Sequence, residues 1–182
     1  MTEVVAQRTD TAFVRWLDRR IDGRRTLESN ELRQLARRLG RERWIWGPHA
    51  RHEDHERVTV LLHRQDALDV WLLCWLDTQE TGFHDHDRSA GAFYVCEGAL
   101  VEDVLRVDRD GTLRTDTREA LSGTSRSFGS GHIHGVRHLG SRPATSIHVY
   151  SPALRGMGHY ETDADGALQR VHRTYDEGPV EP

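Results

Sequence analysis

The chain has 182 residues, a net charge of −4 and an isoelectric point near 6.3. This length suits a single domain with one core, and the mild negative charge argues against nucleic acid as a partner. All 25 basic residues are arginine, because the sequence contains no lysine, which excludes Schiff-base and pyridoxal phosphate chemistry at a lysine amine. The longest apolar run, from Val70 to Leu76, is too short to span a bilayer, so we expect no membrane contact.

The first part of the chain, residues 1–48, has a helical pattern. Apolar residues recur at helical spacing over residues 11–20 and again over residues 26–39. We expect a Thr or Ser side chain to cap the second helix and Gly40 to end it. The segment from Trp44 to Pro48 then breaks the pattern.

Short strands separated by turns follow over residues 57–160. The expected strands are residues 58–62, 69–75, 93–96, 100–107, 113–115, 135–139 and 145–150. Asp110-Gly111 predicts a hairpin between two of them, and the polar tail, residues 166–182, is expected to fray. We therefore predict one mainly β domain over residues 1–182, with two N-terminal helices packed on a small antiparallel barrel or jelly roll.

Twelve histidines is a high count for this length and suggests a bound metal. His84 and His86 are two residues apart, so in a strand both rings face the same side. His132 and His134 form a second such pair. A single histidine pair of this kind more often lies on the protein surface than binds a metal. We expect no functional role for the more scattered histidines, which are His49, His52, His55, His63, His159 and His172.

A third polar group lies on one predicted strand, where Ser146, His148 and Tyr150 alternate. Alternate residues of a strand share a face, and a face of plain core would be apolar. Polar groups on an inward face need one another, a metal or a ligand as partners. The strand is therefore expected to contribute to a site.

These groups resemble the two cupin motifs. In the first motif, a histidine pair is followed by an acidic ligand and then by a glycine. Here Gly98 follows His84 and His86 at a fitting distance, and Ala90 or Gly91 occupies the acidic position.

In the second cupin motif, a glycine precedes a histidine, and an asparagine follows. Here Gly131 leads to His134, and His138 replaces the asparagine. The resemblance implies a cupin fold and a metal site of three histidines without a carboxylate.

Within cupins, loss of the carboxylate marks the cysteine dioxygenase family of thiol dioxygenases, and the resemblance extends further. Leu73-Cys74-Trp75 resembles the strand that precedes the histidine pair in that family. The family's Ser-x-His-x-Tyr-Ser-Pro signature is matched by Ser146, His148, Tyr150, Ser151 and Pro152. The resemblance covers about half of the chain, from Leu61 to Pro152.

This resemblance implies Fe(2+) held by His84, His86 and His134, with a small thiol and O2 as substrates and a sulfinate as product. It further implies that Tyr150 hydrogen-bonds near the oxygen or the substrate. His148 would orient Tyr150, and Ser146 would orient His148. The bond between Ser151 and Pro152 is a candidate for the cis form.

The chain departs from the family at two places. Some members carry a cysteine that cross-links to the tyrosine, but Gly91 occupies that position, so we predict no thioether at Tyr150. Cys96 is less well placed to substitute for it.

The second departure concerns the arginine that binds the carboxylate of cysteine in the family. Val58 aligns with that arginine, and Arg57 is one residue before it. In a strand, an offset of one residue turns the side chain to the other face, unless a bulge corrects it. Arg57 is our candidate for substrate binding, and the other candidates are Arg51, Arg88 and Arg155. L-Cysteine is the substrate that the family implies, and 3-mercaptopropionate or a thio-imidazole such as ergothioneine remains an alternative.

Two other functions stay open from the sequence. Three histidines also suit Zn(2+) in a hydrolase or lyase, and a cupin can bind a small molecule without catalysis. Cys74 and Cys96 are too few for a disulfide framework, and the N-terminus has no signal peptide pattern. We therefore expect a cytoplasmic protein, as a monomer or small homo-oligomer.

Overall fold

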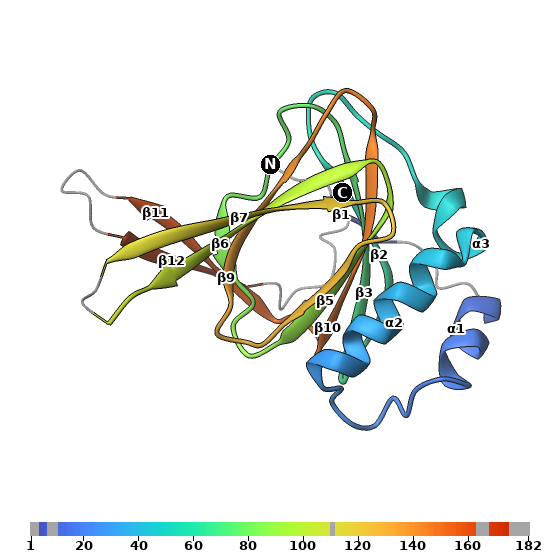
Figure 1. The fold of residues 1–182 in the computed structure, drawn as a ribbon. Coiled ribbons are helices and arrows are strands. Elements are labelled where there is room, and N and C mark those ends of the chain that lie inside the picture. Colours follow the sequence, from blue (N-terminus) through green and yellow to red (C-terminus); the bar gives the residue numbers. More distant parts are fainter. Residues whose placement is uncertain (1–3, 7–10, 110–111, 163–167, 175–182) are drawn as a thin grey trace.

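The computed structural model describes residues 4–6, 11–109, 112–162 and 168–174. Strands dominate this part of the chain and form two six-stranded sheets (Figure 1). The sheets are the walls of a barrel, and the helices lie against the outer face of one sheet (Figure 1). The mainly β fold with N-terminal helices that we predicted is therefore confirmed.

The first sheet has the strand order β1-β2-β3-β10-β5-β8. Its strands are β1 (Val4–Ala6), β2 (Val58–Gln65), β3 (Leu68–Trp75), β10 (Ala144–Ser151), β5 (Ala90–Glu97) and β8 (Ser125–Phe128). β1 runs parallel to β2, and the other neighbours are antiparallel.

The second sheet has the order β12-β11-β4-β9-β6-β7 and is antiparallel throughout. Its strands are β12 (Leu168–Thr174), β11 (Gly156–Thr162), β4 (Phe83–Asp85), β9 (Ile133–His138), β6 (Ala99–Val107) and β7 (Leu113–Leu121).

Strand β3 is buried on both faces, which explains the continuous apolar run that begins at Val70. Its even-numbered residues from Val70 to Cys74 pack toward the helices, and its odd-numbered residues from Trp71 to Trp75 pack into the barrel. The first sheet thus separates two cores. One core lies under the helices, and the other lies between the sheets beside the candidate site.

The helices are α1 (Thr11–Asp18), α2 (Ser29–Arg41) and α3 (Arg43–Trp46), followed by the 3-10 helix η1 (Gly47–His49). The helical turns of α3 and η1 replace the expected break between Trp44 and Pro48.

Two expectations about the second helix are wrong. Glu28 is the N-cap in place of a Thr or Ser, and its backbone N–H donates to Glu31 Oε2 at 2.9 Å, as in a capping box. Gly40 lies inside α2 rather than ending it. A Cβ at Gly40 would lie 2.0 Å from the ring of Tyr94, so glycine allows α2 to pack closely on β5.

The expected tail is also partly wrong, because residues 168–174 form β12 and pair along β11. The remaining tail residues lie outside the described ones, as does the expected turn Asp110-Gly111, although the flanking β6 and β7 pair as predicted. Strands β1, β8 and β11 were not expected either. The exposed β7 extends to Leu121, well beyond the expected 113–115, since an exposed strand lacks the apolar alternation on which the prediction depends.

The bond between Ser151 and Pro152 is cis, as the family resemblance implied. Within the described ranges, every helix is too short or too polar to cross a membrane.

Candidate metal centre and its cavity

Three histidines meet inside the barrel. His84 lies on β4, His86 directly follows that strand, and His134 lies on β9, where it is paired with His84. Each offers a ligand nitrogen, and these nitrogens lie within 4.8 Å of one another. The three side chains are at most 3% exposed. The structure therefore brings together the three residues that we predicted as metal ligands.

The hydrogen bonds of these rings leave nitrogens for a metal. His84 Nδ1 lies 3.1 Å from the carbonyl oxygen of Gly82, and His134 Nδ1 lies 2.8 Å from Glu102 Oε1, so Nε2 of each ring remains. Both nitrogens of His86 are buried without a hydrogen-bond partner among the described residues. A buried polar atom without a partner is unfavourable, and a metal ion would satisfy it. The three histidines therefore fit a bound metal.

The same burial sets the charge of the three rings. Burial holds the pKa of His84 and His86 well below the ordinary value, and neighbouring imidazoles lower it further. Burial also lowers the pKa of His134, although Glu102 opposes the shift. At neutral pH the rings are therefore neutral, which is the form that binds a metal.

Glu102 is a site residue that we did not identify from the sequence. It lies on β6, is 3% exposed, and accepts a hydrogen bond from Arg126 Nη1 at 2.8 Å. Leu100 and Val104 lie two residues before and after it and are also buried. A charged residue between two apolar positions of one strand face was the signal that could have revealed it.

Glu102 also forms a second group of potential ligands with His132 and His134. However, His134 Nδ1 is already hydrogen-bonded to Glu102, and His132 Nε2 lies 3.4 Å from the same oxygen. Burial would raise the pKa of Glu102, but the hydrogen bonds from His132 and His134 keep it well below its usual range. Glu102 is thus placed behind His134, where it orients the ring, while His132 stacks on Phe128.

Ser146, His148 and Tyr150 form a hydrogen-bonded chain on β10. Trp75 Nε1 donates to Ser146 Oγ at 2.9 Å, Ser146 Oγ lies 2.9 Å from His148 Nε2, and His148 Nδ1 lies 3.4 Å from Tyr150 Oη. Because the indole donates to Ser146 Oγ, the Ser146 proton is available for His148 Nε2, and in that tautomer the imidazole proton lies on Nδ1 toward Tyr150. Burial lowers the pKa of His148 to about 3, so this ring is neutral. The ring of Tyr150 lies 5.0 Å from that of His86.

A cavity of about 610 Å³ opens beside these residues. Site residues that line it are His84, His134, His148 and Tyr150. Apolar side chains that line it are Trp71, Leu73, Phe83, Val136, Leu154 and Met157. Strands β11 and β12 contribute a further, more polar wall with His159, Tyr160, Glu161, Arg173 and Thr174. The candidate metal centre is therefore accessible to a small molecule.

Arg57, the candidate for substrate binding, also lines the cavity. It directly precedes β2, its Nη1 donates to the carbonyl oxygen of Glu80 at 2.7 Å, and its guanidinium carbon lies 4.7 Å from the ring centre of Trp75. Val58 packs instead into the core under the helices. The other candidates, Arg51, Arg88 and Arg155, are exposed and do not line the cavity.

Gly91 lies opposite Tyr150 in the pairing of β5 with β10. A Cβ at Gly91 would lie 2.4 Å from Cε2 of Phe128 and 2.9 Å from Cδ1 of Tyr150, so a side chain there would displace the Phe128 ring. Cys96 packs against the core under the helices, whereas Tyr150 belongs to the core of the barrel. Neither position offers a thiol to Tyr150, and we expect its ring to be unmodified.

Asp85 lies between two candidate ligands but binds elsewhere. Its carboxylate accepts hydrogen bonds from Arg170 at 2.6 and 2.8 Å and from Tyr160 Oη at 2.7 Å, which ties β12 and β11 to β4. Burial would raise the pKa of Asp85, but these hydrogen bonds hold it well below its usual range. His138 lies outside the ligand group, and its Nε2 is 2.8 Å from the carbonyl oxygen of Arg142.

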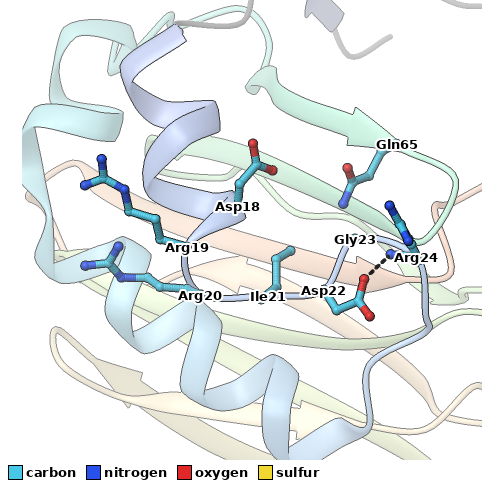
Figure 2. Close-up of a pocket in the computed structure, with 8 residues that line it drawn as sticks. All are labelled: Asp18, Arg19, Arg20, Ile21, Asp22, Gly23, Arg24 and Gln65. Atoms are coloured by element: carbon cyan, nitrogen blue, oxygen red, sulfur yellow. Dashed lines mark hydrogen bonds between the residues drawn. The ribbon is translucent and has the colours of Figure 1, made fainter.

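A separate hollow lies at the end of α1, lined by residues 18–24 and Gln65 (Figure 2). Its volume is about 660 Å³, but it contains none of the candidate site residues. Figure 2 shows Arg19 and Arg20 directed away from Gln65, so the side chains do not converge on one point. The barrel cavity is therefore the better candidate for a functional site.

The chain is similar to known proteins in sequence and in fold. Residues 1–163 match the family model of cysteine dioxygenase type I. The solved structure of TT1209 from Thermus thermophilus is 24% identical, over 58% of this chain and 92% of that chain, with a TM-score of 0.47. A conserved protein with a double-stranded β-helix domain from Klebsiella pneumoniae subsp. pneumoniae is 17% identical, over 61% of this chain and 84% of that chain, with a TM-score of 0.50.

The second of these similarities concerns the fold, which is the double-stranded β-helix of cupins. The family match covers most of the chain and includes His84, His86, His134 and the strand from Ser146 to Tyr150. The chain therefore belongs to the cysteine dioxygenase type I family, whose members are thiol dioxygenases of the cupin superfamily.

Proposed function

We propose that this protein is an Fe(2+)-dependent dioxygenase that inserts both atoms of O2 into the sulfur of a small thiol, so that RSH and O2 give the sulfinic acid RSO2H. The observation that carries the proposal is the set of three buried, neutral histidines without a carboxylate among them. A site of this kind stays cationic when it holds a divalent metal, so it favours an anionic thiolate as substrate. A carboxylate ligand would reduce that preference.

His84, His86 and His134 would hold the metal through ring nitrogens, and Glu102 would fix the orientation of His134. When bound, Fe(2+) supplies redox chemistry with O2 and open positions next to a thiolate. Phe128 stacks on His86 at 4.7 Å between ring centres and helps to keep water from that side of the site.

Tyr150 would supply a hydrogen bond at the reacting end of the cavity. The hydrogen bonds from Trp75 through Ser146 and His148 would hold the phenol at this end of the cavity, and the proton of His148 lies on the side of Tyr150 when Ser146 donates to His148 Nε2. The low pKa of His148 keeps this ring from becoming a second cation beside Arg57. We therefore assign Tyr150 a direct role, and His148 and Ser146 positioning roles.

Arg57 would bind the carboxylate of the substrate, because it brings a guanidinium to the cavity wall beside Trp75. L-Cysteine is the substrate that the family name implies, and 3-mercaptopropionate and ergothioneine also combine sulfur with a carboxylate.

We further propose a cytoplasmic enzyme of one domain, residues 1–182, that acts as a monomer or small homo-oligomer without nucleic acid or membrane as partners. The free thiols of Cys74 and Cys96 support a reducing compartment.

The test is O2 uptake by protein loaded with Fe(2+) under anaerobic conditions, against cysteine, 3-mercaptopropionate, cysteamine and ergothioneine. We expect stoichiometric uptake with at least one thiol and none with His86→Ala. Identification of the metal that co-purifies with the protein separates the alternative of a Zn(2+) hydrolase or lyase, since zinc does no redox chemistry. Absence of uptake with every thiol, in protein of confirmed iron content, would contradict the proposal.

A further inference from the structure

Thr59 lines the cavity and carries a buried hydroxyl without a hydrogen-bond partner among the described residues. Side chains alternate along β2, so Val58 and Val60 pack toward the helices, while Thr59 lies on the cavity face together with Arg57. Thr59 is only 9% exposed, and its Oγ1 is buried without a hydrogen-bond partner among the described residues. Such an atom is unfavourable unless a water molecule or a ligand satisfies it.

His159, on the opposite sheet, carries a second buried polar atom of this kind. It lies on β11, opposite His84 in the pairing with β4, and it lines the same cavity. Its Nε2 is buried and has no hydrogen-bond partner within the described part of the chain. Met157 and Glu161, two residues away on either side, also line the cavity, so this whole face of β11 is part of its wall. His159, for which we expected no role, is therefore a candidate residue of the cavity site.

The cavity is also larger than cysteine requires. Its volume is about 610 Å³. A water molecule takes about 30 Å³ of the liquid, so a thiol with seven non-hydrogen atoms fills roughly 200 Å³. Arg173 and Thr174 on β12 extend the wall further, and both lie beyond the residues that match the family model. The space beyond the sulfur and carboxylate positions therefore suits a larger molecule.

We infer that Thr59 and His159 bind a polar group of the substrate other than its sulfur and its carboxylate, and that the substrate is a thiol larger than cysteine. This inference rests on the proposed function. A hydroxyl and a neutral imidazole can each donate or accept, so the group they recognise is an amide or a nitrogen of a heteroaromatic ring. The apolar side chains of Trp71 and Leu73 suit the carbon skeleton of such a molecule.

The test compares two short thiols, cysteine and 3-mercaptopropionate, with two extended ones. Cysteinylglycine provides an amide, and ergothioneine provides a ring with nitrogen. Calorimetry with anaerobic, Fe(2+)-loaded protein measures binding, and O2 uptake measures turnover. We expect one extended thiol to have a kcat/KM about tenfold or more above that of cysteine, since a site with hydrogen-bonding groups discriminates strongly against molecules that leave them unpaired.

The variants are Thr59→Val and His159→Phe. Each is expected to lower the affinity and the kcat/KM for the extended thiol by about tenfold or more, with changes below about twofold for cysteine. Thr145→Val is the matched control for a buried threonine outside the cavity, and His172→Phe is the control for an exposed histidine of β12. Neither control should change the preference between thiols.

The outcomes separate this inference from the proposed function. Turnover that favours cysteine, or variants that match the unsubstituted protein with all four thiols, would overturn the inference and leave the dioxygenase proposal standing. If an extended thiol binds through Thr59 and His159 but causes no O2 uptake, the inference is supported and the dioxygenase proposal is contradicted. Failure of every thiol to bind would contradict both.

Discussion

Glu102 Oε1 lies 2.8 Å from Nδ1 of His134, so a buried carboxylate stands behind an imidazole that faces the candidate metal position. Arg126 holds the other carboxylate oxygen at 2.8 Å, which fixes the carboxylate in place. A negative charge thus supports a site whose three candidate ligands are neutral. The cupin motif has a carboxylate among its metal ligands. Here that ligand is absent, and the carboxylate of Glu102 contacts the candidate ligand His134 instead.

The Glu102→Gln variant is expected to bind Fe(2+) about 10- to 100-fold more weakly, because the amide orients His134 less firmly and adds no negative charge. Competition with a chromogenic chelator measures this affinity without turnover. Glu119→Gln, an exposed carboxylate on the neighbouring β7, is the control and should leave the affinity unchanged. Equal affinity in both variants would contradict the role of Glu102.

The series of hydrogen bonds from Trp75 through Ser146 and His148 to Tyr150 predicts that variants of Tyr150 and His148 have a lower kcat. Tyr150→Phe removes the phenolic hydroxyl and is expected to lower kcat about 100-fold, with little change in KM. His148→Gln should give a smaller loss, since it disturbs the orientation of the phenol but leaves it present. Steady-state O2 uptake at saturating thiol measures both values. A Tyr150→Phe variant with unchanged kcat would remove Tyr150 from the mechanism.

Arg57→Ala is expected to raise KM for a carboxylate-bearing thiol roughly 10- to 100-fold and to change kcat less, because a hydrogen bond to a charged group is lost. Cysteamine, which has no carboxylate, should be insensitive to the change. Arg88→Ala is the control, since Arg88 is exposed and does not line the cavity. If Arg57→Ala leaves KM unaltered for every thiol, another residue binds the carboxylate.

Burial of histidine predicts acid sensitivity of the metal-free protein. The folded pKa of His148, about 3, lies below its ordinary value of 6.5. Between these values the unfolded chain binds a proton that the folded protein does not, so the free energy of unfolding falls as the pH drops below about 6.5 and is unaffected above it. Each such ring contributes a slope of at most ~1.4 kcal/mol per pH unit. His84, His86 and His134 act in the same direction.

Urea denaturation of metal-free protein between about pH 8 and pH 5 measures this dependence. His148→Gln removes one titrating ring and should reduce the slope. A free energy of unfolding that stays constant down to pH 5 would show that the rings are protonated in the folded state.

Much of the site could be predicted from the sequence because its residues follow strand alternation. His148 and Tyr150 are two residues apart on β10, and this spacing places both on one face. His84 and His86 have the same spacing, with His86 directly after β4. Whether the side chain of Val58 or that of Arg57 reaches the cavity was established only by the structure. The register of β2 shifts near Leu61, and β2 itself starts after Arg57, so counting along the chain could not establish which side chain reaches the cavity.

The missed features depend on contacts between distant segments. Glu102 meets His134 only through the pairing of β6 with β9, and His159 meets His84 only through that of β11 with β4. Strand β12 is mostly exposed, so its sequence has the polarity of a loop. It is held by the bonds of Arg170 to Asp85, which no local pattern reveals.

The central claim is most directly tested by the fate of the oxygen atoms. The Fe(2+)-loaded protein is supplied with its preferred thiol and with O2 labelled with the heavy isotope of oxygen, and the product is analysed by mass spectrometry. A thiol dioxygenase gives a sulfinate in which both oxygen atoms on sulfur carry the label. A product with one labelled oxygen, or a disulfide with no label, would contradict the account.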